Sequence, residues 1–370
     1  MPLLQSAPAT LHPYFGYRSP GGIRISARIL RQRRPQFGGE GTFRALTTLL
    51  SQYASHEVAG HPVTLAVSTA DGRVHRFDTV TDKEGFALFD VTLPDPRHQP
   101  ATTVWETVQF HYDNDDGAQC AEGHLLVPGS DSKLAIISDI DDTIIETGIT
   151  GGIGAILRHW RRLLATMPGQ RLAVPGADSF YRQLGGGPFD PGDPEPASLG
   201  ERMQATPRPF FYVSSSPWNL SAYLVAFKQV KGLPLGPMML RDWGLNRETL
   251  GKGSHGAHKI EAIRQIIAAF PDRHFALVGD DTQGDFDAFA QVAAIAPDRI
   301  AAIFIRRAAS APLDEAELAA RQQIEKLGIP LWVGDSYDVG QDFLREAGLA
   351  GEAEPRQLVV AVEEEAQARE

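Results

Sequence analysis

Short apolar runs alternate with segments of helical length along the chain from about residue 134 onward. Parallel strands need a long crossover between them, usually a helix, so this alternation is typical of a parallel α/β sheet. The apolar runs occupy residues 134–138, 210–214, 275–279, 301–305 and 330–333. The helical candidates occupy residues 220–231, 259–269, 286–294, 313–327 and 339–347. We therefore predict an α/β fold for the larger, C-terminal part of the chain.

Between about residues 20 and 130, β-rich runs such as HPVTLAVST and TTVWETVQFHY follow one another with turn signals between them. Residues 81–85 and 113–117 contain the Asp, Asn and Gly residues that favour turns. The second of these, DNDDG, does not fit a calcium loop, because its glycine comes one place early and no glutamate follows at the required offset. The pattern predicts a small all-β, sandwich-like domain.

Charge and cysteine content exclude several classes of protein. The chain has 35 basic and 46 acidic side chains, a net charge of −11, which argues against a nucleic-acid partner. Its one cysteine, Cys120, allows neither an intrachain disulfide nor a zinc cluster, so we expect a cytoplasmic location. The N-terminus lacks a secretory signal pattern, and no apolar stretch reaches the roughly 20 residues that span a bilayer. Any membrane contact is therefore expected to be peripheral.

The apolar run at residues 134–138 leads directly into an acidic cluster, Asp139-Ile-Asp141-Asp142-Thr143. Ligands of open α/β sheets bind beyond the carboxyl ends of the strands, so these carboxylates are placed to act on a substrate. Like charges so close together repel, and a Mg²⁺ ion would relieve the repulsion while also accepting phosphate oxygens. The alternative is an acidic turn that caps the next helix.

Three further segments place polar side chains next to predicted strands or helices. Ser214 ends a strand and precedes a helix, where a hydroxyl suits a phosphate oxygen, although serines there are more often simple N-caps. Lys259 opens a predicted helix, where the helix dipole disfavours a cation, so phosphate neutralisation would give a reason for it. Asp280 and Asp285 follow the strand FALVG, and they either complete and orient a metal site or form an acidic loop.

The order of these motifs resembles that of the haloacid dehalogenase superfamily over about residues 134–333: DxDxT after a strand, Ser after a strand, Lys on a helix, and GDxxxxD after a strand. The segments DIDDTIIET, FFYVSSSPWNL, LRDWG, HKIEAI and FALVGDDTQGDFDAF are similar to the catalytic domain of actin-patch-associated phosphatidate phosphatases, distant relatives of lipins. The β-rich segment is similar, through weaker motifs, to the sequence before that domain in bacterial members.

The resemblance implies a Rossmann-like parallel sheet of the haloacid dehalogenase type with a small inserted cap, preceded by the all-β domain. We therefore divide the chain into an N-terminal extension (1–20), a β-rich accessory domain (21–130), a phosphatase domain (131–350) and an acidic tail (351–370). The cap is expected at about residues 148–208, which contain the Gly/Pro-rich stretch GGGPFDPGDPEP.

By this resemblance Asp139 is a nucleophile that forms an aspartyl-phosphate. Asp141 is a general acid for the leaving alcohol and then a general base for water. The resemblance also implies that Mg²⁺ is held by Asp139, the backbone carbonyl of Asp141, and Asp280. These three residues therefore form the expected catalytic and metal-binding centre.

The remaining motif residues have binding or supporting roles in the resemblance. Ser214 and Lys259 would hold the equatorial oxygens of the phosphoryl group. Thr143 would support the loop geometry, and Asp285 would orient the centre through a neighbouring group. Many superfamily phosphatases carry glycine in place of Asp142, whose own role the sequence leaves open.

The function expected from the resemblance is hydrolysis of phosphatidate to diacylglycerol. A phosphatase of a soluble phosphate ester is an alternative, since catalytic residues define phosphoryl transfer rather than the leaving group. A non-catalytic phosphatidate-binding module is a further alternative, which intact Asp139 and Asp141 argue against. A lipid substrate needs an apolar surface, for which Trp160, Trp218 and Trp243 are candidates, although each also suits a core. Substrate, pathway, oligomeric state and the role of the β-rich segment remain open at this level.

Overall fold

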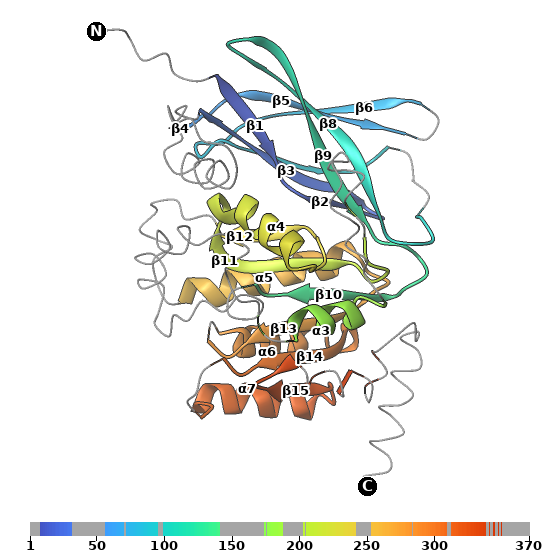
Figure 1. Ribbon diagram of the computed structural model, residues 1–370, viewed down its shortest axis with the longest axis vertical. Helices are drawn as coiled ribbons and strands as arrows, with labels where there is room; N and C mark the ends of the chain where they lie inside the picture. The colour runs from blue at the N-terminus through green and yellow to red at the C-terminus, as the bar shows by residue number, and fades with distance from the viewer. Residues whose placement is uncertain are drawn as a thin grey trace, which may run out of the picture.

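The computed structural model describes residues 8–31, 56–69, 72–94, 99–140, 174, 176–187, 203, 205–241, 253–282, 284–308, 312–337, 340, 343–344, 347 and 349. These residues form two sheets with helices around the second (Figure 1). The β-rich sheet occupies the upper part of the view, and the parallel sheet with its helices lies below it. The chain passes from the first sheet to the second between residues 127 and 134.

The β-rich sheet follows the order β1-β3-β2-β9-β8-β5-β6, with β4 and β7 also paired to β3. It is a mixed sheet, because β2 and β9 are parallel while the other neighbours are antiparallel. The predicted turn at residues 113–117 connects β8 to β9. The strands have these bounds: β1 Ala9–Pro13, β2 Gly16–Ser19, β3 Gly22–Arg31, β4 His56–Glu57, β5 Pro62–Ser68, β6 Val74–Val80, β7 Phe86–Val91, β8 Val104–Asn114 and β9 Gly117–Val127.

The β-rich sheet encloses an apolar core of its own. Alternate residues of a strand point to opposite faces, and one face of β3 contributes Ile23, Ile25 and Ile29 to this core. The rings of Phe89 in β7 and Phe110 in β8 lie 5.8 Å apart, although these two strands are not hydrogen-bonded neighbours. The sheet therefore folds over on itself, which gives it the layered, sandwich-like packing of its interior.

The second sheet has the order β12-β11-β10-β13-β14-β15, and every pairing in it is parallel. Each apolar run predicted as a strand forms one. The α/β class predicted for this part of the chain is therefore confirmed. The strands have these bounds: β10 Leu134–Ser138, β11 Phe210–Pro217, β12 Met238–Arg241, β13 His274–Asp280, β14 Ile300–Arg306 and β15 Leu331–Gly334.

Helices cover both faces of the parallel sheet, because its central strands are apolar on both sides. In β10, Leu134 and Ile136 belong to the core under α3 and α4, whereas Ala135 and Ile137 belong to the core under α5, α6 and α7. The helices have these bounds: α3 Ala177–Leu184, α4 Ser221–Val230, α5 Gly253–Ala269, α6 Asp285–Ile295 and α7 Glu315–Lys326. Short 3₁₀ turns, η2 Trp218–Leu220 and η4 Pro297–Arg299, precede α4 and β14.

Two elements differ from the sequence prediction. Strand β12 was not predicted, because its four residues are too few to show a clear period. Helix α5 begins at Gly253 rather than at Lys259, even though glycine and serine disfavour helix at residues 253–256. The helix predicted at 339–347 and the acidic tail at 351–370 lie mainly or wholly outside the described residues.

Helix α3 falls within the range predicted for the cap. Its residues Phe180 and Tyr181 are fully buried in the core of the parallel sheet, where Phe180 packs against Phe304 at 5.2 Å and Tyr181 stacks on Phe210 at 5.6 Å. Residues 177–184 therefore cover the sheet rather than the ends of its strands. The segments 148–173 and 188–202 of the predicted cap lie outside the described residues.

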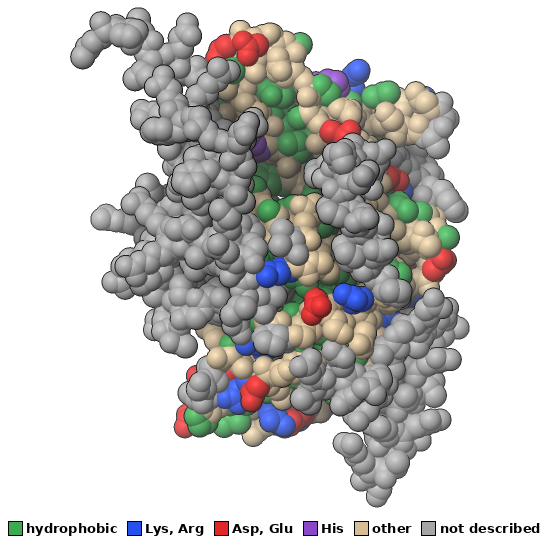
Figure 2. Space-filling view, in the orientation of Figure 1, with side chains coloured by type: hydrophobic (Ala, Val, Ile, Leu, Met, Phe, Trp, Pro, Cys, Tyr) green, Lys and Arg blue, Asp and Glu red, His purple; other side chains and the backbone are tan. Residues whose placement is uncertain are grey.

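The two sheets meet through aromatic side chains. Tyr17 of β2 packs against Phe211 at 5.7 Å and Phe270 at 5.5 Å. Trp218 packs against Tyr14 at 4.6 Å. Figure 2 shows hydrophobic side chains where the β-rich part meets the α/β part on the visible face. Within the described residues, no helix has both the length and the apolar character needed to cross a membrane.

Candidate functional site

The carboxyl ends of three neighbouring strands bring the predicted site residues to one edge of the parallel sheet. Ser138 in β10 is paired with Tyr212 in β11 and with Val278 in β13. Asp139 comes one residue beyond this level, and Ser214 and Asp280 come two residues beyond it. The backbone N–H of Asp139 donates to the carbonyl of Val278 at 2.8 Å, which continues the sheet up to that residue. The parallel register therefore gathers Asp139, Ser214 and Asp280 at the same edge.

Lys259 of α5 reaches the same edge and contacts two carboxylates. Its Nζ lies 3.0 Å from Asp139 Oδ1 and also donates to Asp285 Oδ1. Lys259, Asp139 and Asp285 are exposed by 2% or less. Lys259 lies near the end of the second turn of α5, so the expectation that it opens its helix is wrong. These buried ion pairs, rather than a position at the helix end, account for the lysine.

Three carboxylates converge around this lysine. Asp139, Asp280 and Asp285 each offer an oxygen within 4.8 Å of the others. Asp285 is oriented by its neighbours, since Lys259 donates to its Oδ1 and the backbone N–H of Asp280 donates to its Oδ2 at 3.2 Å. Asp139 and Asp280 are therefore better placed than Asp285 to offer oxygens to a cation. Such oxygen donors suit a hard divalent cation.

Burial and charge shift the protonation equilibria of this cluster. Burial, reinforced by Asp285, raises the pKa of Asp280 to about 7 against the opposing effects of Lys259 and of hydrogen bonds from Thr282. Burial alone would lower the pKa of Lys259, but Asp139, Asp285 and Asp280 outweigh it and raise that pKa. One ammonium thus faces three carboxylates, and burial is the main cause of the raised pKa of Asp280.

Hydrogen bonds from Thr282 fix the carboxylate of Asp280. Its backbone N–H donates to Asp280 Oδ1 at 2.6 Å, and its hydroxyl donates to the same oxygen at 2.5 Å. The next residue of the loop, Asp281, accepts from Arg307 Nε at 2.7 Å and from the backbone N–H of Ala308 at 2.8 Å. The loop that follows β13 is therefore held to the end of β14. Neither Thr282 nor Arg307 was predicted from the sequence, although the Asp280-Asp281 doublet marked this loop as a candidate part of the site.

A hydroxyl pair lies behind Asp139. Ser138 Oγ donates to the carbonyl oxygen of Asp139 at 2.6 Å and lies 2.7 Å from the hydroxyl of Tyr181. Since the serine hydrogen is directed to the carbonyl, the Tyr181 hydroxyl donates to Ser138. Sequence reasoning missed both residues, and no local signal could have found Tyr181, which comes from a separate helix.

The remaining predicted residues stand as follows. Ser214 is fully buried, and its Oγ accepts from the backbone N–H of Ser216 at 2.9 Å within the last part of β11, where the pairing with β12 is irregular. Asp141, Asp142 and Thr143 lie outside the described residues. The structure thus brings together Asp139, Lys259, Asp280 and Asp285 by direct contacts, and Ser214 by register.

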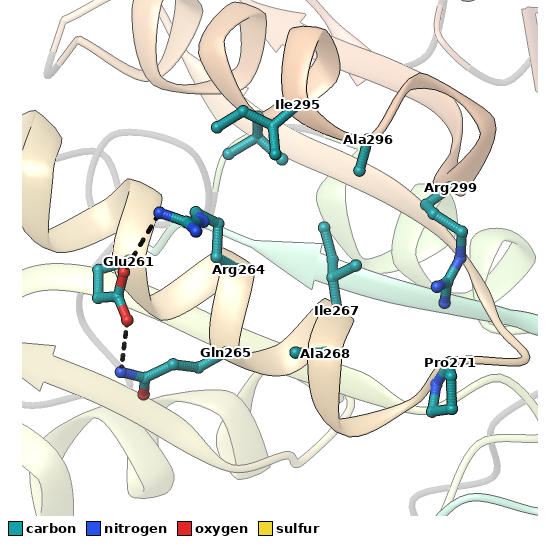
Figure 3. A pocket seen from close by; sticks show the side chains of 10 residues that line it. Glu261, Arg264, Gln265, Ile267, Ala268, Pro271, Ile295, Ala296 and Arg299 are labelled. Atoms are coloured by element: carbon teal, nitrogen blue, oxygen red, sulfur yellow. Dashed lines mark hydrogen bonds and ion pairs between the residues drawn. The ribbon is translucent and has the colours of Figure 1, made fainter.

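A separate cavity of about 310 Å³ lies between α5 and α6 (Figure 3). Its charged side chains are engaged within the protein: Glu261 accepts from Gln265 at 3.0 Å, and Arg299 Nη2 donates to the carbonyl of Phe270 at 2.6 Å. None of the carboxylates at the strand ends lines it. This cavity is therefore a groove between helices and is separate from the candidate site.

Residues 134–307 match the family model described as the catalytic domain of phosphatidate phosphatase APP1. The match begins at the first residue of β10 and ends just after β14, so it contains the whole carboxylate and lysine cluster. This part of the chain is therefore similar to the APP1 catalytic-domain family. The family resemblance inferred from the motifs is thereby confirmed.

Two curated relatives extend the APP1 likeness beyond the catalytic domain. Phosphatidate phosphatase APP1 of Saccharomyces cerevisiae is 27% identical over 279 residues, which cover 70% of this chain and 40% of the relative. An uncharacterized protein of Schizosaccharomyces pombe is 26% identical over 235 residues, which cover 63% of this chain and 35% of the relative. The chain therefore spans less than half the length of these relatives.

A search of solved structures adds no support for a fold family. The chitinase ChiW of Paenibacillus sp. str. FPU-7 aligns with 87% of this chain and 26% of its own, at 10% identity and a TM-score of 0.19. A score this low carries no argument about the fold or the function.

Proposed function

We propose that this chain is a Mg²⁺-dependent phosphatase that hydrolyses phosphatidate to diacylglycerol through an aspartyl-phosphate on Asp139, and that its parallel sheet is of the haloacid dehalogenase type. The observation that carries the proposal is the buried contact of Lys259 with Asp139, 3.0 Å long, at the carboxyl ends of the strands. A carboxylate and an ammonium at this edge are the groups that nucleophilic attack on a phosphate ester needs.

Asp139 and Asp280 are the residues that would hold Mg²⁺. Their oxygens lie within 4.8 Å of each other, and burial, with a smaller effect of Asp285, raises the pKa of Asp280, so a cation bound there would favour its charged form. Bound there, Mg²⁺ would neutralise charge on the transferring phosphoryl group. Thr282 donates twice to one oxygen of Asp280, so this carboxylate is held in place before a cation binds.

The proposed reaction has two steps, and both involve Asp139 and Asp141. A carboxylate oxygen of Asp139 attacks phosphorus, the bond from phosphorus to the lipid oxygen breaks, and that oxygen takes a proton from Asp141. Water then attacks the aspartyl-phosphate and gives a proton back to Asp141, which releases phosphate and restores Asp139. Asp141 lies outside the described residues, so its role is assigned from the DxDxT motif alone.

Lys259 and Ser214 would bind phosphoryl oxygens. Asp285 accepts a hydrogen bond from the ammonium of Lys259, so Lys259 is held in place before the phosphate arrives. Ser214 lies two residues beyond the pairing of Ser138 with Tyr212, at the same edge, where its hydroxyl would bind a phosphoryl oxygen. With Mg²⁺, these groups would balance the charge of the phosphoryl oxygens in the transition state.

The match to the APP1 catalytic-domain model and the likeness to the Saccharomyces cerevisiae protein carry the assignment of phosphatidate as the substrate. The site itself fits phosphoryl transfer from any monoester, because its residues act on the phosphate and not on the alcohol. With a single cysteine, Cys120, we place the reaction in the cytoplasm, with peripheral contact to the membrane that holds the lipid.

A phosphate-release assay over a substrate panel tests the proposal. Wild-type protein is given phosphatidate in detergent micelles, a sugar phosphate, a nucleotide and an aryl phosphate, each with Mg²⁺ and with excess chelator. We expect fastest release from phosphatidate, loss of release in chelator, and recovery on adding Mg²⁺. Faster release from a soluble ester would replace the substrate assignment. Full turnover in chelator would contradict the metal site, and binding of phosphatidate without any release would show a non-catalytic module.

A further inference from the structure

A groove of about 260 Å³ lies where β12 and α5 of the α/β part face the β-rich part. Apolar side chains from both parts line it, including Phe15, Leu88, Trp218, Met239 and Leu240. This size and lining are those of a site for an apolar ligand group rather than for a charged one. The groove contains none of the carboxylates at the strand ends.

One end of the groove lies at the candidate catalytic edge. The pairing of β11 with β12 matches Val213 with Met239 and Pro217 with Arg241. Leu240 therefore lies beside residues 214–216, at the level of Ser214. On the helix side, the lining residue His258 directly precedes Lys259. Both walls of the groove thus begin next to groups proposed to bind the phosphate.

The groove then leads away from that edge along α5. His258, Ala262 and Gln265 line it from positions four and three residues apart, so they share one face of the helix. At 1.5 Å per residue, the seven steps from His258 to Gln265 cover about 10 Å. Strand β12 and the preceding Pro237 line the same wall, from Leu240 back to Pro237. A linear group that starts at the phosphate site could therefore lie along it.

The charge and exposure of the lining residues fit an uncharged occupant. Arg24 lines the groove, and its Nη1 is paired with Asp90 Oδ2 at 2.6 Å. Leu88 lies on the rim with 51% of its surface exposed. An apolar chain that covers this leucine removes apolar surface from water, and this burial favours binding of the chain in the groove.

A second cavity, of about 290 Å³, lies on the other side of Trp218. Apolar and polar side chains line it, His12, Ser221 and Gln229 among the polar ones, and Arg28 there donates to Asn219. None of its lining residues belongs to α5, the helix that carries Lys259. The groove along β12 and α5 is therefore the better placed site for a chain attached to the phosphate.

We infer that the groove along β12 and α5 binds an acyl chain of a glycerophospholipid whose phosphate lies at Asp139. This inference rests on the proposed function and adds where the lipid is held. Phe15 and Leu88 line the groove from the side of the β-rich part, so that part contributes directly to binding the substrate.

Short-chain phosphatidates test this inference. Diacyl substrates with butanoyl, hexanoyl and octanoyl chains are compared below the concentrations at which they form micelles, and kcat/KM is measured for each. Every methylene that enters the groove should raise kcat/KM about fourfold, until the groove is filled. Release from a soluble aryl phosphate by the wild type monitors the catalytic centre by itself.

Two matched variants locate the effect. Leu88→Asp places a charge on the rim, whereas Val80→Asp places one on a side chain that is 59% exposed and lies outside the groove. We expect the ratio of kcat/KM between octanoyl and butanoyl substrates to fall at least tenfold in Leu88→Asp and to stay at the wild-type value in Val80→Asp. The ratio is independent of the amount of folded protein.

The outcomes separate this inference from the proposed function. If the wild type hydrolyses all three lipids with equal kcat/KM, the groove does not bind the chain, while the phosphatase assignment stands. An equal fall of the ratio in both variants would also overturn the inference, because it would show a general effect of surface charge. Absence of release from every phosphate ester would overturn the proposed function and this inference together.

Discussion

Replacement of Asp280 by Asn should stabilise the metal-free protein at neutral pH while it removes activity. Asparagine has nearly the same shape and can still accept the two hydrogen bonds from Thr282. It removes a carboxylate whose pKa rises from 3.8 to about 7 on folding, chiefly because of burial and of Asp285. A shift of about three units corresponds to ~4 kcal/mol, at about 1.36 kcal/mol per unit.

The sign follows from the direction of the shift. Because the pKa of Asp280 is higher in the folded state, its contribution to stability is complete below pH 3.8 and is lost as the pH rises through about 7. In chelator, the free energy of unfolding of the wild type should therefore fall by up to ~4 kcal/mol from this group over that range. The Asp280→Asn variant should lack this fall.

Urea unfolding in chelator between pH 5 and pH 8 measures the difference. We expect Asp280→Asn to exceed the wild type most at pH 8 and little at pH 5, whereas Asp178→Asn, at an exposed position of α3, should match the wild type throughout. Mg²⁺ at a hundredfold excess over its Kd should stabilise the wild type by ~2.7 kcal/mol and leave Asp280→Asn unchanged. An Asp280→Asn protein that is no more stable than the wild type at pH 8 would refute the reasoning.

Three further substitutions test other parts of the structure. Lys259→Met leaves the carboxylates of Asp139 and Asp285 without their cation, so it should lower the free energy of unfolding by ~3–5 kcal/mol in urea at pH 7, and an unchanged value would contradict the buried ion pairs. Tyr181→Phe removes the hydroxyl that donates to Ser138 and should cost about 1 kcal/mol by the same measurement, while a loss within error would show that the contact is dispensable. Lys228 is fully buried with its Nζ 3.6 Å from the centre of the Tyr212 ring, and burial lowers its pKa well below 10.5. Lys228→Met should therefore stabilise the protein, and the gain should be larger at pH 7 than at pH 9. The reason is that the wild type regains stability as the pH rises toward the pKa of this lysine in the unfolded state. Destabilisation by Lys228→Met at pH 7 would contradict this.

Much of the α/β sheet could be predicted because its strands are buried on both faces and read as continuous apolar runs. The convergence of Asp139 and Asp280 also follows from sequence, since the carboxyl ends of parallel strands meet at one edge. Lys259 could be placed on a helix, but the start of that helix could not, because residues 253–256 are poor helix formers.

Contacts between distant segments could not be predicted in the same way. Tyr181 reaches Ser138 because α3 packs on the sheet, and nothing in its local sequence marks it. Trp218 was a candidate for an apolar surface, and the structure shows it against Tyr14 of the β-rich part, where it also lines the groove. Trp160 and Trp243 lie outside the described residues. Such contacts depend on how the two sheets pack together, which no periodic pattern encodes.

Turnover by Asp139→Asn tests the assignment of the nucleophile most directly. The substitution keeps the shape of the side chain and removes its charge, so the variant should unfold cooperatively like the wild type. With saturating Mg²⁺ and phosphatidate, we predict that Asp139→Asn releases no phosphate above background, while Asp178→Asn releases it at the wild-type rate. Phosphate release by Asp139→Asn at a rate near that of Asp178→Asn would show that another group attacks phosphorus.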